Sequence, residues 1–261
     1  MLATDDLDLL TRAAQDAGQI ALRHLTAGPK VWQKSDGQGP VTDADLEIDR
    51  MLRNTLCAAR PEYGWLSEES RDTPERLGRA RVFIVDPIDG TRAFAQGQHG
   101  FAHALAVVEH GQPIAAVVHL PVPGLTYHAL RGQGAFLNGQ RIMATDRTAV
   151  TGARVLAPQS QFAPEFWQGG VPLIAPHFRP SLAWRMALVA EGQFDAMLSL
   201  RQTWHWDIVA GALLIAEAGG KASDGQGQAL HFNTKSAFSD GIIAAGAKVH
   251  SGLLDLRIPP V

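Results

Sequence analysis

The hydrophobic pattern of the N-terminal part of the chain predicts two amphipathic helices. Apolar side chains recur at intervals of three and four from Leu10 to Leu25, which predicts a helix that ends before Gly28. A second helix is predicted to begin after Thr42, a residue suited to cap it, and to end before Pro61. The polar stretch 30–40 between the two helices is predicted to be a loop.

Short apolar runs follow and predict an antiparallel meander of strands. Two of these runs are joined through a glycine-containing turn and are typical of a β-hairpin. The expected strands are 102–108, 114–118, 125–130 and 135–137.

In the second half of the chain, strands and helices are predicted to alternate. The expected strands are 155–157, 194–200 and 241–245, and the expected helices are 182–191 and 206–218. In the first half, helices come first and strands follow, whereas in the second half strands and helices alternate. This order predicts a layered α+β or α/β sandwich, in which sheets lie between layers of helices. We expect an N-terminal α+β unit over 1–147 and a C-terminal α/β unit over 148–261.

One short stretch combines a buried strand with two carboxylates. Val82 to Val85 has the composition of a core strand, and we expect it to end in a charged turn that contains Asp86 and Asp89. The backbone amides of Gly90 and Thr91 would lie beside these acids. Carboxylates and free amides together suit a divalent cation that carries a phosphate, although the same residues are also common in ordinary turns.

Further acids each have an ordinary structural explanation when taken singly. Asp45 has the position of the reciprocal carboxylate in a capping box. Asp207 lies in the first turn of a predicted helix, where it would complement the helix dipole. Glu68 and Glu69 follow an apolar pair and are typical of surface charge.

The composition is that of an ordinary globular protein. With 261 residues, 46% of them hydrophobic and 19% charged, the chain can bury a substantial core. A net charge of -3 gives no general electrostatic reason to bind nucleic acid or an anionic membrane. Cys57 is the only cysteine, so no intrachain disulfide can form, and the sequence has no signal pattern or membrane span. We therefore expect a cytoplasmic protein.

Four segments taken together resemble the inositol monophosphatase superfamily of magnesium-dependent, lithium-sensitive phosphatases. They are Val41 to Asp45 (Val-Thr-Asp-Ala-Asp), Leu66 to Glu69 (Leu-Ser-Glu-Glu), Val85 to Thr91 (Val-Asp-Pro-Ile-Asp-Gly-Thr) and Trp206 to Gly211 (Trp-Asp-Ile-Val-Ala-Gly). The likeness spans nearly the whole chain, and the third segment is highly specific. It implies a layered sandwich like that of fructose-1,6-bisphosphatase, and a homodimer, as is common in the superfamily.

The resemblance also implies which residues hold magnesium. Glu68 and Asp86, with the main-chain carbonyl of Ile88, would hold one ion, and Asp86, Asp89 and Asp207 would hold a second. A third ion would lie near Glu68, mostly through water. Because these carboxylates repel one another without cations, we expect the site to bind two to three magnesium ions readily.

The implied reaction is in-line attack of an activated water on phosphorus, without a phospho-enzyme. Asp45 and the hydroxyl of Thr91 would form a pair that orients or deprotonates a water, and Glu68 is the other candidate base. The residues expected to contact the substrate are Gly90, Thr91, Ser181 and Arg92.

Finer matches resemble one branch of the superfamily, the bacterial 3'(2'),5'-bisphosphate nucleotidases, which remove the 3'-phosphate of adenosine 3',5'-bisphosphate. They include Phe94 and Thr203, beside the two most specific motifs. Inositol monophosphatases usually carry an acid, which contacts inositol hydroxyls, at the position of Leu200. We expect a small phosphorylated substrate, with this nucleotide first and inositol phosphate or another phosphate ester as alternatives. Arginines that could bind a second phosphate are Arg92, Arg179, Arg185 and Arg201.

Two other classes of function have less support. His99 and His103 are four residues apart, but a glycine lies between them and the glutamate of a zinc-protease motif is missing. Some superfamily members also bind transcription or RNA machinery, so a second, regulatory role stays open. Removing magnesium distinguishes phosphatase activity from a regulatory role, because phosphatase turnover would vanish while a metal-independent interaction would survive.

Overall fold

The computed structural model describes residues 2–34 and 39–258 of the chain. Its largest element is a sheet with the strand order β3-β4-β5-β6-β7-β8-β9, in which β3 and β4 are parallel and all other neighbours are antiparallel. The strands are β3 (Gly64–Ser67), β4 (Arg81–Asp89), β5 (Ala102–Glu109), β6 (Gln112–Leu120), β7 (Leu125–Leu130), β8 (Gly134–Leu137) and β9 (Gln140–Ile142). The meander predicted over 102–137 is confirmed.

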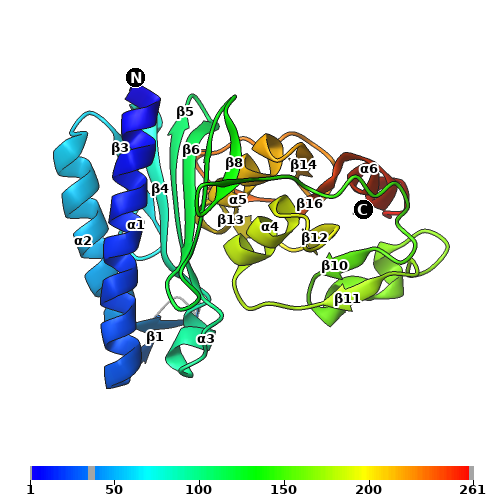
Figure 1. The fold of residues 1–261 in the computed structure, drawn as a ribbon, viewed down its shortest axis with the longest axis horizontal. Helices are drawn as coiled ribbons and strands as arrows, with labels where there is room; N and C mark the ends of the chain where they lie inside the picture. Colours follow the sequence, from blue (N-terminus) through cyan, green and yellow to red (C-terminus); the bar gives the residue numbers. More distant parts are fainter. Residues whose placement is uncertain (1, 35–38, 259–261) are drawn as a thin grey trace.

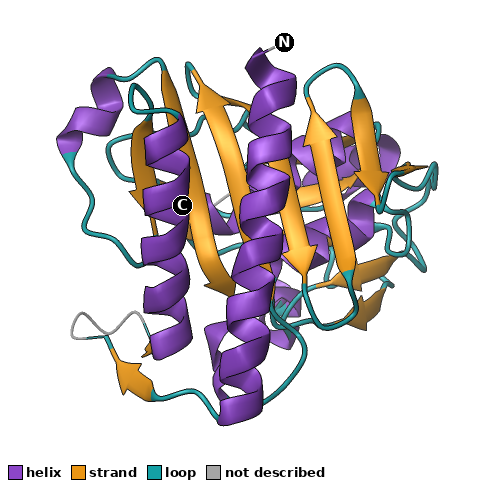
Figure 2. Ribbon diagram, turned by 60° about the vertical axis from the view of Figure 1, so that its left-hand side comes forward, coloured by secondary structure: helices purple, strands orange, loops and turns teal. Residues whose placement is uncertain are grey.

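Two long helices, α1 (Leu2–Ala27) and α2 (Asp43–Ala59), cover one face of this sheet (Figures 1 and 2). Their apolar faces form one buried cluster with the residues of β4 and β5 that point the same way. The stretch predicted to be a loop instead contains two short antiparallel strands, β1 (Val31–Gln33) and β2 (Pro40–Thr42). Three residues are too few for an alternating pattern to appear in the sequence. Residues 35–38, at the centre of that stretch, lie outside the described residues.

The other face of the sheet is covered by α4 (Leu182–Ala190) and α5 (His205–Glu217), which lie between it and a second sheet (Figure 1). The second sheet has the order β11-β10-β12-β16-β14. Its strands are β10 (Arg154–Leu156), β11 (Ala175–His177), β12 (Ala196–Ser199), β14 (Gly220–Ser223) and β16 (Ile242–Gly246). Because α5 is enclosed by sheets on both sides, its sequence is apolar nearly all round.

The helix α6 (Ala247–Asp255) covers the outer face of the second sheet and completes five alternating layers of helix and sheet. The layered sandwich predicted from the sequence is thereby confirmed. Smaller elements are α3 (Thr91–Ala95), after β4, and the antiparallel pair β13 (Thr203–Trp204) and β15 (Phe238–Ser239), beside the start of α5. The division into units at residue 147 stays a prediction. Within 2–34 and 39–258, no helix has both the length and the apolar character needed to cross a bilayer.

Candidate active site

The parallel pairing of β3 with β4 brings Glu68 beside Asp86. Ser67 is paired with Val85, so the residue that follows each of them continues at the same edge of the sheet. The amide of Glu68 also donates a hydrogen bond to the carbonyl of Val85, over 3.3 Å. Two acids that are 18 positions apart in the sequence therefore become neighbours.

The strand that we expected to end at Val85 continues to Asp89. Pro87 lacks an amide hydrogen and the acids around it are typical of turns, so the sequence favoured a strand end. The structure instead has a β-bulge at this point, because the pairing with β5 shifts between Asp86 and Asp89. The charged turn predicted here is therefore wrong, and the acids belong to the strand.

The bulge makes both acids of β4 point to the same face of the sheet. Asp86 is paired with Ala104, and Asp89 with Ala102, so two residues of β4 lie opposite one residue of β5. In a regular strand, residues three apart point to opposite faces. Here Asp86 and Asp89 both face α4 and α5, while Ile88 packs in the cluster beneath α1 and α2.

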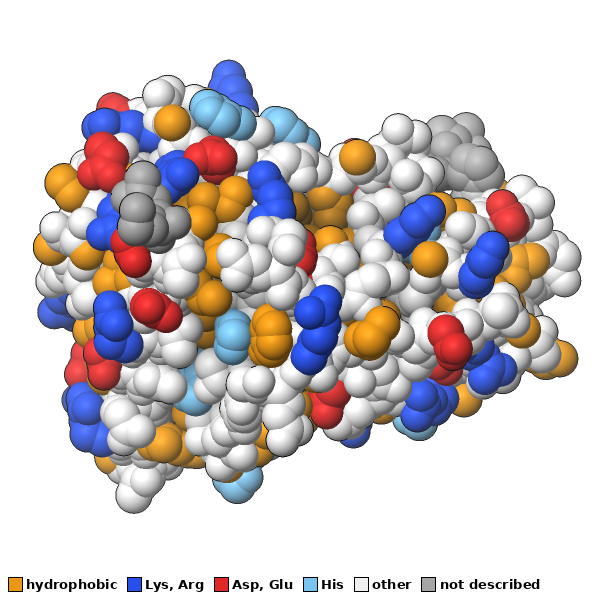
Figure 3. Space-filling model, turned by 45° about the horizontal axis from the view of Figure 1, so that its top comes forward, with side chains coloured by type: hydrophobic (Ala, Val, Ile, Leu, Met, Phe, Trp, Pro, Cys, Tyr) orange, Lys and Arg blue, Asp and Glu red, His pale blue; other side chains and the backbone are white. Residues whose placement is uncertain are grey.

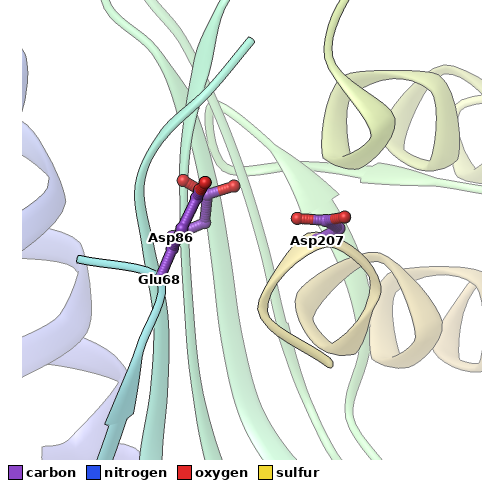
Figure 4. A group of neighbouring side chains, drawn as sticks. All are labelled: Glu68, Asp86 and Asp207. Carbon is purple, nitrogen blue, oxygen red and sulfur yellow. The ribbon is translucent and has the colours of Figure 1, made fainter. Parts of the chain in front are cut away.

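The third acid of the cluster comes from the first turn of α5. Carboxylate oxygens of Glu68, Asp86 and Asp207 all lie within 4.8 Å of one another (Figure 4). Asp89 lines the same cavity as these acids, and its Oδ2 accepts hydrogen bonds from the Ser181 hydroxyl and the Ala183 amide, each over 2.6 Å. The fold thus collects at one place the acids that the resemblance assigned to metal ions.

Burial of these acids disfavours their charged forms. It raises the pKa of Asp86 and of Asp207 well above the usual range, and neighbouring carboxylates add to the shift. Burial likewise raises the pKa of Asp89 to about 6, against the opposing effect of its hydrogen bonds to Ser181 and Ala183. A cation bound among these carboxylates would favour their charged forms.

The donor set fits a hard divalent cation. Asp86 Oδ1 is buried and has no hydrogen-bond partner among the described residues, which leaves a carboxylate oxygen available for an ion. Carboxylates and a main-chain carbonyl are the ligands that magnesium accepts. A cation of the chain itself, Lys34, already lies at the rim, where its ammonium contacts Glu68 over 2.7 Å and Glu69 over 2.8 Å.

Asp45 forms the capping box predicted from the sequence and also contacts Thr91. Thr42 and Asp45 form a capping box at the start of α2, in which the Thr42 amide donates to Asp45 Oδ2 over 2.9 Å. The other oxygen, Oδ1, accepts from the Thr91 hydroxyl over 3.2 Å, and that hydroxyl also lies 2.9 Å from the carbonyl of Ile88. The capping acid is therefore linked, through Thr91, to the end of β4, which contains Asp86 and Asp89.

A cavity of about 690 Å³ opens in front of the acids. Gly90 and Thr91 line it, as does the exposed side chain of Arg92. Ser181, expected to contact the substrate, is fully buried, and its hydroxyl bonds to Asp89 and caps α4. The remaining basic lining comes from Arg185 and Arg201.

Two residues make hydrogen bonds beside the site that the sequence analysis did not predict. Asp49 accepts hydrogen bonds from Ser67, over 2.6 Å, and from Ser70, over 2.5 Å, and so holds the segment that contains Glu68. The sequence could have indicated Asp49 by its position one helical turn after Asp45, on the same face of α2. His103, which was considered only as a zinc ligand, instead bonds to the carbonyl of Pro87.

The fold and the site together define a layered α/β protein with a cluster of acids that could hold a metal ion, beside a cavity of about 690 Å³. The model of the inositol monophosphatase family matches residues 4–257. An inositol-1-monophosphatase of Rhizobium meliloti (strain 1021) is 35% identical over 234 residues, which are 85% of this chain and 86% of that protein. The 3'(2'),5'-bisphosphate nucleotidase CysQ of Aggregatibacter actinomycetemcomitans is 31% identical over 246 residues, 91% of each chain.

Among solved structures, an IMPase of Thermotoga maritima superposes with a TM-score of 0.83 at 28% identity, over 96% of both chains. The chain belongs to the inositol monophosphatase family. A phosphatase is the activity that this membership supports.

Proposed function

We propose that the chain is a magnesium-dependent, lithium-sensitive phosphomonoesterase that uses water as its nucleophile. The observation that carries the proposal is the convergence of Glu68, Asp86 and Asp207 within 4.8 Å. Glu68, Asp86 and the carbonyl of Ile88 would hold one ion, and Asp86, Asp89 and Asp207 a second. Magnesium bound there would supply positive charge that activates water and offsets the negative charge of the transition state.

Asp45 and Thr91 would take the proton of the attacking water. Thr91 lines the cavity, whereas Asp45 is shielded from solvent behind it. Burial raises the pKa of Asp45 to about 6, close to the pH at which a general base works best. Thr91 would accept the proton of the water as it gives its own to Asp45. Glu68 is the alternative base.

We further propose that the substrate carries a second phosphate, with adenosine 3',5'-bisphosphate as the best candidate. Arg185 lines the cavity although it is only 3% exposed. The carbonyls of Arg179 and Pro180 hold its guanidinium, which lies over the ring of Phe178. Burial lowers its pKa to about 10, so it stays charged at neutral pH. A fixed, buried guanidinium suits a phosphate better than a neutral sugar.

Two further observations favour this substrate over inositol phosphate. Arg92 and Arg201 add positive charge to the same cavity. Position 200, where an acid would accept hydrogen bonds from inositol hydroxyls, is a leucine that packs against the core beneath α6. The CysQ relative supports the nucleotide, and the 35% identical relative keeps inositol-1-phosphate as the alternative.

The test is a comparison of turnover on adenosine 3',5'-bisphosphate and inositol 1-phosphate, each with magnesium and with a chelator. We expect phosphate release that requires magnesium and a higher kcat/KM for the bisphosphate. Release that persists in the chelator would overturn the proposed metal dependence. A preference for inositol 1-phosphate would overturn only the choice of substrate.

Lithium should inhibit turnover at roughly millimolar concentration, since this small cation would compete with magnesium for the same oxygen ligands. Full activity at high lithium concentration would contradict this expectation. Acidic and basic side chains are interspersed on the face shown in Figure 3, in keeping with a small-molecule substrate. The homodimer and the cytoplasmic location stay predictions.

A further inference from the structure

The bulge in β4 leaves one backbone carbonyl in an unusual position. Pro87 has no amide hydrogen, and it lies at the point where two residues of β4 are opposite one residue of β5. The residue opposite is His103, whose Nδ1 lies 2.5 Å from the carbonyl oxygen of Pro87. A side chain of β5 thus provides the hydrogen bond at a place where the ladder between the strands is interrupted.

The hydrogen bond has a defined direction. A carbonyl oxygen only accepts, so Nδ1 of His103 must carry the hydrogen. Burial lowers the pKa of His103 to about 3, which keeps the imidazole neutral and leaves Nε2 without a hydrogen. Among the described residues, Nε2 has no partner. The ring lies between Phe101 and His119, with centroid distances of 6.0 and 6.1 Å, which restricts its orientation.

We propose that His103 is a positioning residue for the metal ligands, and that its bond to Pro87 holds the bulge on which their arrangement depends. Asp86 and Asp89 face the same side of the sheet only because the bulge adds one residue between them. The carbonyl of Ile88 follows directly after the bonded one. His103 itself lies on the opposite face of the sheet and touches no reacting atom.

Loss of the bond would affect the site through the backbone. The carbonyl of Pro87 would be left buried and unpaired, so the strand would gain by shifting to a conformation that pairs it elsewhere. Such a shift changes the face to which Asp89 points relative to Asp86. The inference therefore rests on the proposed metal site, but it adds a residue that no motif includes.

Two polar substitutions separate the bond from general packing. In His103→Asn, the amide nitrogen occupies nearly the place of Nδ1 and can still donate to Pro87. In His103→Gln, the amide lies one atom further out and cannot. We expect His103→Gln to weaken magnesium binding, measured by calorimetry, by about tenfold, equivalent to about 1.4 kcal/mol. His103→Asn should stay within about threefold of the parent chain, because its donor is retained.

His119→Gln is the control, since it alters the neighbouring ring and leaves the bond to Pro87 in place. Its magnesium affinity should match that of the parent chain. Equal affinities for the Asn and Gln variants of His103, or an equal loss in His119→Gln, would overturn the role of His103. A parent chain that binds no magnesium would instead refute the proposed function itself, so the two failures can be told apart.

Discussion

The Thr91 hydroxyl lies 3.2 Å from Oδ1 of Asp45, 46 positions away in the sequence. Asp45 also caps α2 through its other oxygen, so one carboxylate connects the start of a helix to the edge of the candidate site. The capping role predicted for this acid is therefore confirmed, and its second oxygen remains available for the catalytic role that we propose.

The two roles of Asp45 can be separated by mutation. Thr91→Ala removes the hydroxyl at the cavity and should lower kcat by about a hundredfold, within the range of a lost proton-transfer group. Thr42→Ala removes the cap and should lower the free energy of unfolding by about 1 kcal/mol, while turnover changes little. Steady-state kinetics and urea denaturation measure the two effects. A similar loss of kcat in both variants would contradict the separation.

Asp86→Asn and Asp207→Asn should abolish magnesium-dependent phosphate release without unfolding the chain. Each substitution would remove a proposed metal ligand, but each also removes a carboxyl whose pKa is raised by burial and by repulsion from neighbouring carboxylates. Without magnesium, we therefore expect thermal stability equal to or above that of the parent chain. Asp195→Asn is the matched control, a buried acid that instead accepts from the Arg154 amide. Near-native rates in either ligand variant would refute the metal assignment.

Stability should depend on pH differently with and without magnesium. Burial raises the pKa of Asp45 and of Asp89 to about 6 and that of Glu69 to about 7. A raised folded-state pKa gives stability that is present below the unfolded value and is lost as pH rises through the folded value. Without magnesium, the contribution of these carboxyls to the free energy of unfolding should thus fall as the pH rises from about 4 to about 7.

Buried histidines oppose this trend, because burial lowers the pKa of His103 to about 3 and of His205 to about 4. The measurement is therefore the difference in Tm between samples with magnesium and with chelator, in which the histidine contribution largely cancels. This difference should grow from about pH 5 to about pH 8, since the ion binds the ionised carboxylates. A difference that shrinks over that range would be contrary to the assignment.

The layers of the fold follow from local patterns, whereas the geometry of the site does not. Helical periodicity predicted α1 and α2, and alternating elements predicted the second half. The parallel pairing that places Glu68 beside Asp86 depends on a four-residue strand, β3, whose sequence has no distinctive pattern. Pro87 correctly indicated a lost ladder bond, but a strand end and a bulge share that signal. In the structure, the Pro87 carbonyl at the bulge is bonded to His103 of the next strand, β5. The residues around Pro87 do not indicate that a partner lies 16 positions away.

Arg185→Met tests whether the cavity recognises a second phosphate. The substitution keeps an unbranched side chain in a buried position and removes the charge. We expect kcat/KM for adenosine 3',5'-bisphosphate to fall by about tenfold or more, the scale of a lost charge-assisted hydrogen bond, and that for inositol 1-phosphate to fall much less. Equal losses for both substrates would indicate a structural role for Arg185 and count against the second phosphate.

Gly90 should be required both for its backbone conformation and for its small volume. Its φ of 101° lies in a region that side chains rarely adopt, and an added Cβ would lie 3.0 Å from the carbonyl oxygen of Gly100 and 3.4 Å from Cα of Phe101. Gly97 also has a positive φ, 71°, but a Cβ there would meet nothing within 4 Å. Comparing the two glycines separates backbone strain from packing against Gly100 and Phe101, just before β5.

Gly97→Ala should lose about 1 kcal/mol of stability and keep its turnover, since only strain is added at the surface. Gly90→Ala should lose more stability, because the added Cβ meets the backbone of Gly100 and Phe101, which cannot move aside as a flexible side chain could, so the backbone at position 90 is displaced. That displacement carries Asp89 and Thr91, on either side of Gly90, away from the acids opposite. Gly90→Ala should therefore also bind magnesium more weakly, as calorimetry would measure. Equal stability and unchanged affinity in the two variants would mean that the turn after β4 has more freedom than its contacts indicate.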